Sequence, residues 1–236
     1  MHISLRSAHV VKAGNAGDEY EDALWPEVDL DRRVSGFRCA VADGASESSF
    51  SGEWARLLAQ SWSCGGGSTR RWLAELPRLS RRWEAAIPAG ALPWYVQAKI
   101  DQGAFAALVG VHVVDSRRWT AMAVGDSCVV QVRSGRRIAS FPYTAPEQFG
   151  NRPLLVPSRG RVPNVLHTAG TWRPGDTFYL MSDALAQWSM GEGERSWRLL
   201  DRAFCGRATF TDLVRRLRSR GRLRNDDVTV QRLTVH

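Results

Sequence analysis

Acidic residues stand at the ends of several apolar segments that lie far apart in the chain. The set comprises Glu21, Asp22, Asp43, Asp183 and Asp226. Taken singly, each of these acids is typical of a solvated turn. Acids that gather from distant strand ends suit hard divalent cations, because Mg²⁺ and Mn²⁺ prefer oxygen ligands. The shared placement of the five residues therefore favours a metal site built from carboxylates.

The dipeptide Asp43-Gly44 ends the apolar run 36–42 and has two interpretations. Asp-Gly is common in turns, and on that interpretation it only redirects the chain. An acid beside a glycine, whose backbone can approach a ligand closely, also suits a metal or phosphate site. The dipeptide alone leaves both interpretations open, and the decision rests on the other acids.

The cysteines and histidines do not indicate a second kind of metal site. The cysteines are Cys39, Cys64, Cys128 and Cys205, and no two of them have Cys-x-x-Cys spacing, which disfavours a zinc ribbon. No two histidines are four residues apart, which disfavours a histidine site on a helix.

The chain is basic, with a formal net charge of +8 and a pI of about 10.0. This charge raises the expectation of an acidic partner. The arginines are nevertheless scattered in pairs, so nucleic acid is not favoured as a partner. One dense group, Arg215, Arg216, Arg218 and Arg220, lies off the apolar stripe of a predicted helix. A solvated helix face is favoured there over the docking of an acidic partner.

Hydrophobic periodicity predicts a mixture of strands and helices. Strands are expected at 3–12, 36–42, 104–114, 119–124, 128–132, 137–141, 177–181 and 228–235, and helices at 46–62, 69–86, 94–102, 196–204 and 210–217. Serines 46, 48 and 49 can cap the first helix, Pro77 marks a kink or interruption in the second, and the break 64–68 separates the two. The Pro- and Gly-rich stretch 142–175 is expected to be irregular. Because strands and helices do not alternate, an α+β fold is favoured over a Rossmann-type sheet.

The length of 236 residues is expected to form one domain, 1–236. No apolar run is long enough to cross a membrane, and the N-terminus lacks the apolar core of a signal peptide. These features predict a cytoplasmic protein with no membrane partner.

Five short motifs in order resemble the type-2C, metal-dependent protein serine/threonine phosphatases. They are "YEDAL" (20–24), "VADGAS" (41–46), "AVGDSCVV" (123–130), "LMSDALAQW" (180–188) and "RNDDVTV" (224–230). Each motif alone is a weak signal, but their order and spacing over residues 20–230 are specific.

The resemblance implies an α-β-β-α sandwich of two antiparallel sheets flanked by helices. It also implies two Mn²⁺ or Mg²⁺ ions and hydrolysis of phosphoserine or phosphothreonine by a hydroxide that bridges them. Asp43 would bridge the ions, the Gly44 carbonyl would bind one of them, and Asp183 and Asp226 would hold the other. Glu21, supported by Asp22, would act on the second metal. A phosphorylated protein is the expected substrate, and a cognate serine/threonine kinase is left open as a partner.

Several positions depart from the family pattern. Gly17 stands where the family usually has a phosphate-binding arginine, and Lys12 is the nearest cation, although a surface lysine is slightly favoured. Ala184 and Asp227 replace a glycine and an asparagine without changing the expected metal ligands. Asp126 is expected to orient the cleft or form a turn.

Three alternatives remain open from the sequence. A third metal ion near Asp101 is one, and the stretch 142–175 is either a substrate flap or a plain surface loop. The chain could also be a phosphatase-fold module that binds a regulatory partner with weak or no catalysis. Retention of Glu21, Asp43, Asp183 and Asp226 favours the active enzyme.

Overall fold

Several strands of the sheets bury apolar side chains on both faces. In the computed structural model, which describes residues 1–65, 68–88, 94–150, 152–162, 164–205 and 209–236, successive residues of a strand alternate between two cores. Phe37, Cys39 and Val41 pack between the two sheets, whereas Ala40 and Ala42 pack under a helix. Such strands are continuous apolar runs in the sequence, which is why several of them could be predicted.

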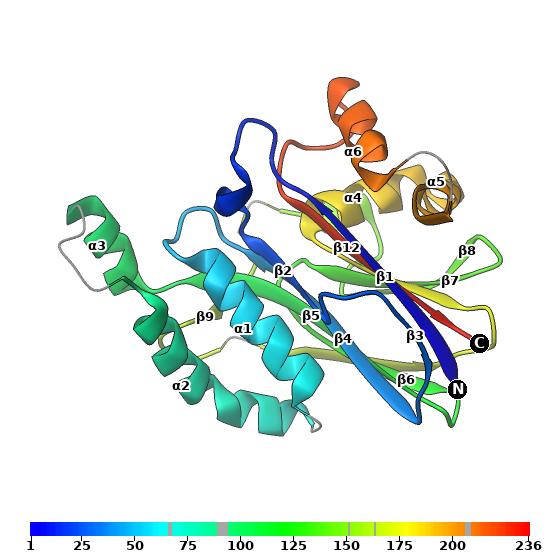
Figure 1. Cartoon of the computed structure of the whole chain (residues 1–236), viewed down its shortest axis with the longest axis horizontal. Helices are drawn as coiled ribbons and strands as arrows, with labels where there is room; N and C mark the ends of the chain where they lie inside the picture. The colour runs from blue at the N-terminus through cyan, green and yellow to red at the C-terminus, as the bar shows by residue number, and fades with distance from the viewer. Residues whose placement is uncertain (66–67, 89–93, 151, 163, 206–208) are drawn as a thin grey trace.

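Two antiparallel sheets lie face to face, as Figure 1 shows. The first has the order β3 (Leu30–Arg33), β1 (His2–Val10), β12 (Val228–Val235), β11 (Thr177–Met181), β7 (Cys128–Arg133), β8 (Arg136–Phe141). The second has the order β10 (Leu166–Thr171), β6 (Arg118–Val124), β5 (Phe105–Val114), β4 (Gly36–Gly44), β2 (Asp22–Trp25), and β9 (Val156–Pro157) pairs with the start of β5.

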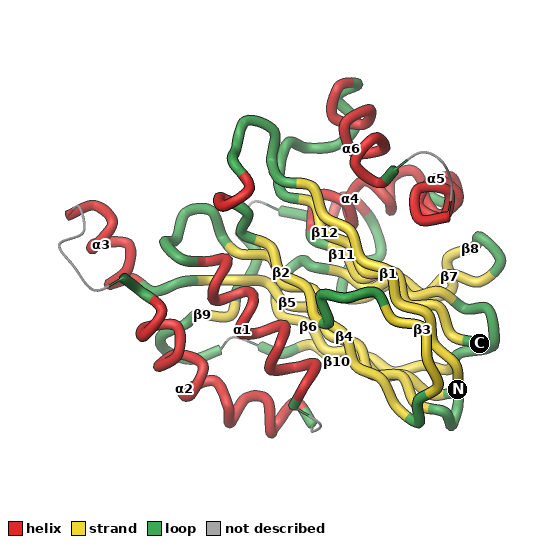
Figure 2. The backbone as a smooth tube through the Cα atoms, in the orientation of Figure 1, coloured by secondary structure: helices red, strands yellow, loops and turns green. Residues whose placement is uncertain are grey.

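Helices cover the outer faces of both sheets (Figure 2). α1 (Ser51–Cys64) lies on the second sheet, α2 (Thr69–Ala86) packs against α1 (Figure 1), and α3 (Trp94–Gln102) contributes Ile100 to the same core. On the first sheet lie α4 (Asp183–Glu192), α5 (Glu194–Cys205) and α6 (Phe210–Ser219). Short 3₁₀ turns occur at Gly17–Glu19 and Pro146–Gln148. Three apolar layers result, one under each helix group and one between the sheets. The predicted α-β-β-α sandwich is confirmed.

The first predicted helix begins later than expected. α1 starts at Ser51, and Phe50 precedes it in the left-handed conformation with φ of 58°. No side chain caps this end, so the predicted capping by Ser46, Ser48 or Ser49 is wrong. The Ser48 hydroxyl instead donates to the Ala45 carbonyl and accepts from the backbone of Phe105.

The other differences concern segments whose structure depends on tertiary packing. α2 continues through Pro77, because Trp72, Leu79 and Trp83 bury one side of it. The stretch 142–175 contains β9 and β10 and is only partly irregular. The strands β2 and β3 and the helix α4 were not predicted. In the predicted break 64–68, residues 66–67 lie outside the described residues. No helix in the described part of the chain is long and apolar enough to cross a membrane.

The contact between α1 and the second sheet depends on a residue without a side chain. A Cβ atom added to Gly110 of β5 would lie 2.2 Å from Nε1 of Trp62 on α1. The indole therefore packs directly on the backbone of β5.

We expect Gly110→Ala to lower the free energy of unfolding by about 1–3 kcal/mol, because a methyl group there must displace a packed indole. Urea unfolding measures the change. Gly17→Ala is the control, since no atom lies within 4 Å of its added Cβ. Equal stability of the two variants would show that α1 is not held on β5 in this way.

Candidate metal centre

The strand registers bring the predicted acids to one edge of the sandwich. Asp22 pairs with Asp43 across β2 and β4, and both share the strand face of residues that pack between the sheets. In the other sheet, β11 ends at Met181 opposite Val230, near the start of β12. Asp183 and Asp226 follow and precede these strand ends. The four acids therefore meet where both sheets end.

Hydrogen bonds at this edge join the two sheets. The backbone N–H of Asp183 points to Oδ2 of Asp43 at 3.5 Å. The hydroxyl of Thr229 on β12 donates to Oδ2 of Asp22 at 2.6 Å and also bonds to the Tyr20 hydroxyl. Asp22 and Asp43 from one sheet thus contact residues that belong to the other.

Burial and mutual repulsion raise the pKa of three carboxyl groups at this edge, those of Asp43, Asp22 and Asp183. For Asp43, loss of solvent is the largest cause and the neighbouring charges of Asp22 and Asp183 add to it. Burial also raises the pKa of Asp22, with Asp227 and Asp183 adding to the effect. Asp183 shifts in the same direction, again mainly by burial. Carboxylates crowded together out of water favour a bound cation.

Asp126, which was expected to orient the cleft or form a turn, lies in this cluster. It lies where the chain crosses from β6 of one sheet to β7 of the other, and only 4% of its surface is exposed. Burial, followed by the charge of Asp183, raises its pKa to about 7. Its type and spacing gave no sign of this burial, because the crossing between sheets is a tertiary feature.

Arg224 lies between two of the predicted ligands. Its guanidinium forms a short ion pair with Asp183 and a second pair with Asp226 at 3.2 Å. The nearby charges of Asp183 and Asp226 raise its pKa, against the opposing effect of burial. This residue was not predicted from the sequence, where its only signal is its place two residues before Asp226.

The donor set fits a hard divalent cation, because it consists of carboxylate oxygens. The raised pKa values show that these carboxylates are crowded and buried, so a bound cation would relieve their repulsion. Among the described residues, no group of three or more acidic, histidine or cysteine side chains is arranged to hold an ion as it stands. Arg224 accounts for this at Asp183 and Asp226. A cation that binds both carboxylates must displace the guanidinium.

Gly44 and Glu21 are close neighbours. A Cβ atom added to Gly44 would lie 2.5 Å from the Glu21 carbonyl oxygen, and the Gly44 N–H donates to that oxygen at 3.2 Å. The glycine therefore allows β4 to approach the backbone before β2. The carboxylate of Glu21 accepts from the Ser51 hydroxyl at 2.6 Å, at the start of α1. Glu21 is thus positioned by the helix that follows the Asp-Gly motif.

Asp227 has a positioning role that was not anticipated. One carboxylate oxygen accepts from the backbone N–H of Lys12 at 2.7 Å, and the other accepts from that of Glu21 at 2.8 Å. This side chain is 7% exposed. It ties the start of β12 to both segments that flank the N-terminal loop. An asparagine amide could accept only one of these bonds through oxygen.

The remaining predicted residues are Lys12 and Asp101. Lys12 lines a surface pocket of about 580 Å³ together with Tyr20, Glu21 and Ser51. Asp101 lies on α3, where its carboxylate accepts from Gln97 in the preceding turn.

The two-sheet sandwich and the acidic cluster at its edge agree with the phosphatase family that the five sequence motifs resemble. A sequence model of the protein phosphatase 2C family matches residues 15–225, and the chain belongs to this family. A comparison with curated proteins finds no match.

Solved structures of phosphatases share the fold at low sequence identity. The serine/threonine phosphatase of S. agalactiae is 13% identical, with a TM-score of 0.64 and coverage of 99% of this chain and 100% of that one. The Mycobacterium tuberculosis phosphatase PstP/Ppp is 18% identical, with a TM-score of 0.60 and full coverage of both chains, 100% each. A PstP catalytic domain in complex with two manganese ions is 19% identical, with a TM-score of 0.54 and coverage of 99% and 100%.

The raised pKa values predict how stability depends on pH. The folded chain holds protons on Asp22, Asp43, Asp126 and Asp183 at pH values where the unfolded chain has lost them. The free energy of unfolding therefore falls as pH rises from about 4 to about 7, where Asp126 ionises. We expect Tm in excess EDTA to fall across this window, and Mn²⁺ to oppose the fall.

Asp126→Asn is the matched variant for this measurement, because it removes one shifted group and should flatten the curve. Thermal unfolding followed by circular dichroism, in excess EDTA and in Mn²⁺, measures Tm for the native chain and the variant. A Tm in EDTA that rises between about pH 5 and pH 7 would contradict the charge repulsion described here.

The position of Arg224 predicts an effect on metal affinity. We expect Arg224→Gln to bind Mn²⁺ about tenfold more tightly, because the ion no longer competes with a guanidinium for two carboxylates. Isothermal titration calorimetry measures the affinity. Arg222→Gln is the control, since Arg222 pairs with Glu192 instead. Weaker binding by Arg224→Gln alone would mean that the arginine supports the site.

Proposed function

We propose that the chain is a metal-dependent protein serine/threonine phosphatase that uses two Mn²⁺ or Mg²⁺ ions. The observation that carries the proposal is the convergence of Asp22, Asp43, Asp183 and Asp226 at one edge of the sandwich. Membership of the protein phosphatase 2C family supports phosphoprotein as the substrate class. We further propose that the protein acts in signalling in the cytoplasm, where a cognate kinase is a candidate partner.

The predicted residues have separate tasks in this proposal. Asp43 would be a ligand common to both ions, the Gly44 carbonyl would be a ligand of one ion, and Asp183 and Asp226 would be ligands of the other. Glu21 would act at the second metal site, with Asp22 in support. When bound, the ions would lower the pKa of a water and neutralise charge on the phosphoryl oxygens.

The residues around these ligands would set their orientation. Thr229 fixes one oxygen of Asp22, and Ser51 fixes one oxygen of Glu21. Lys12 is the proposed phosphate ligand, and its backbone is held at the cluster by Asp227. Arg224, once displaced from Asp183 and Asp226, is a second positive group at the same edge.

The alternative function is a phosphatase-fold module that binds a regulatory partner with weak or no catalysis. One observation favours it: Arg224 already neutralises two of the predicted metal ligands. Metal content and turnover decide between the two functions, because the alternative predicts little of either.

We expect Asp43→Asn to reduce metal-dependent hydrolysis of a phosphothreonine peptide by roughly a hundredfold or more, because the amide cannot replace a bridging carboxylate. Its Tm in EDTA should hold or rise, since one repelling charge is gone. Turnover, bound Mn²⁺ and melting curves are measured together.

Asp115→Asn is the control for this variant, because it removes one exposed acid elsewhere. Asp126→Asn should show a milder loss of turnover. If Asp43→Asn keeps near-native turnover and both ions, the two-metal proposal is wrong. If the native chain is equally active in excess chelator, the proposed mechanism is wrong altogether.

A further inference from the structure

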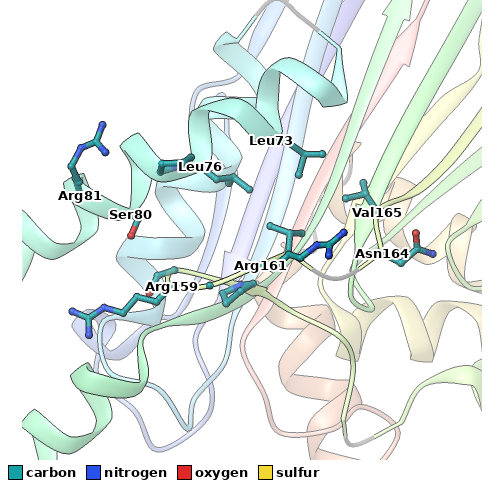
Figure 3. Close-up of a pocket in the computed structure, with 13 residues that line it drawn as sticks. Leu73, Leu76, Ser80, Arg81, Arg159, Arg161, Asn164 and Val165 are labelled. Atoms are coloured by element: carbon teal, nitrogen blue, oxygen red, sulfur yellow. The ribbon is translucent and has the colours of Figure 1, made fainter.

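A groove runs between α2 and the residues 157–162, 164 and 165, on the helix side of the second sheet. It encloses about 1160 Å³. Figure 3 shows Leu73 and Leu76 on α2, with Arg161 and Val165 across the groove. Small-molecule pockets usually enclose roughly 300–1,000 Å³. The size of this groove therefore suits a chain segment better than a small ligand.

Apolar side chains form much of the groove lining. Leu76, Val162 and Val165 are partly buried against the adjacent core, and Pro77 lies beside them. Leu73 is 36% exposed although it faces the groove. An apolar strip of this kind is typical of a surface that binds another chain.

The rim of the groove is positively charged. Arg81 on α2 and Arg161 on the opposite wall are exposed, and neither forms an ion pair or a side-chain hydrogen bond with another described residue. Arg159 is held differently, because it pairs with Glu84 and lies over the Trp83 ring at 5.8 Å. Two arginines are therefore available to an anionic ligand beside an apolar floor.

The wall opposite α2 is fixed to the sheet. The buried Ser158 forms two hydrogen bonds with the backbone of Ala104. Its N–H donates to the Ala104 carbonyl at 2.7 Å, and its hydroxyl accepts from the Ala104 N–H at 2.9 Å. Two residues earlier, Val156 pairs with Ala106 of β5. This anchoring keeps one side of the groove in place before any ligand binds.

We propose that this groove docks an acidic segment of a partner protein, one that carries both carboxylates and aliphatic side chains. The carboxylates would pair with Arg81 and Arg161, and the aliphatic groups would cover Leu73 and Leu76. Nucleic acid fits less well, because no described residue of the lining carries an aromatic ring on which a base could stack. The proposal does not depend on phosphatase activity, since docking is measured directly.

The test measures fluorescence anisotropy of a labelled synthetic peptide of repeated Glu-Glu-Leu triplets with the full chain. Binding is expected, and Arg81→Glu/Arg161→Glu should weaken it by about tenfold or more. Arg198→Glu/Arg215→Glu is the matched control, because it makes the same charge change at exposed positions on α5 and α6. Equal loss in both double variants would overturn the proposal, since it would reveal attraction to net charge alone.

A second pair of variants tests the apolar floor. Leu73→Gln should weaken the binding of the same peptide, whereas Ile138→Gln, at an exposed position on β8, should leave it unchanged. A peptide of Glu-Glu-Ser triplets should bind more weakly than Glu-Glu-Leu. Equal binding of the two peptides would overturn the combined recognition proposed here.

Other occupants of the groove would also overturn it. A dT oligonucleotide that binds with the same dependence on Arg81 and Arg161 would make the groove a nucleic-acid site. A dimer in analytical ultracentrifugation that Leu73→Gln dissociates would assign the groove to a second copy of the chain. Circular dichroism of every variant confirms that loss of binding is not loss of fold.

Discussion

The repulsion among buried carboxylates at one edge of the sandwich is the constraint on which the site depends. Asp22 and Asp43 are held side by side by the β2–β4 register, so they cannot move apart without breaking strand pairing. Asp183 and Asp126 are brought to the same place by the other sheet and by the crossing between the sheets. The fold therefore holds several carboxylates close together, and their negative charge can be neutralised by protons, by an arginine or by metal cations.

The residues around the cluster divide into those that neutralise charge and those that only hold position. Arg224 neutralises, because it pairs with both Asp183 and Asp226. Asp227 adds a further acid but uses both oxygens to bind backbone N–H groups, so it fixes the loops around the site. Arg218 of α6 also holds backbone in place, because it donates to the carbonyls of Val11 and Asp226. That contact differs from the solvated face expected for the arginines of this helix.

Elements with a clear apolar pattern within one segment could be predicted from the sequence. Contacts between residues far apart in the chain could not. The strand that carries Asp43 and the strand that ends two residues before Asp183 are apolar runs, so the placement of these acids could be inferred. β2 could not, since its four residues lie in an acidic stretch. α4 is apolar on most sides and follows β11 at once, which hides its helical period. Arg224 resembles a surface arginine until the fold brings Asp183, 41 residues away, against it.

The sheet also determines how the groove and the acidic edge can influence each other. Ala106 of β5 pairs with Gly44 on one side and with Val156 on the other, so two strand pairings separate the Asp-Gly motif from the groove wall. β5 is buried on both faces along most of its length, and a close-packed strand of this kind resists deformation. A partner docked in the groove would therefore act at the acidic edge by tethering. It would raise the local concentration of a linked phosphorylated segment while leaving the positions of the carboxylates unchanged.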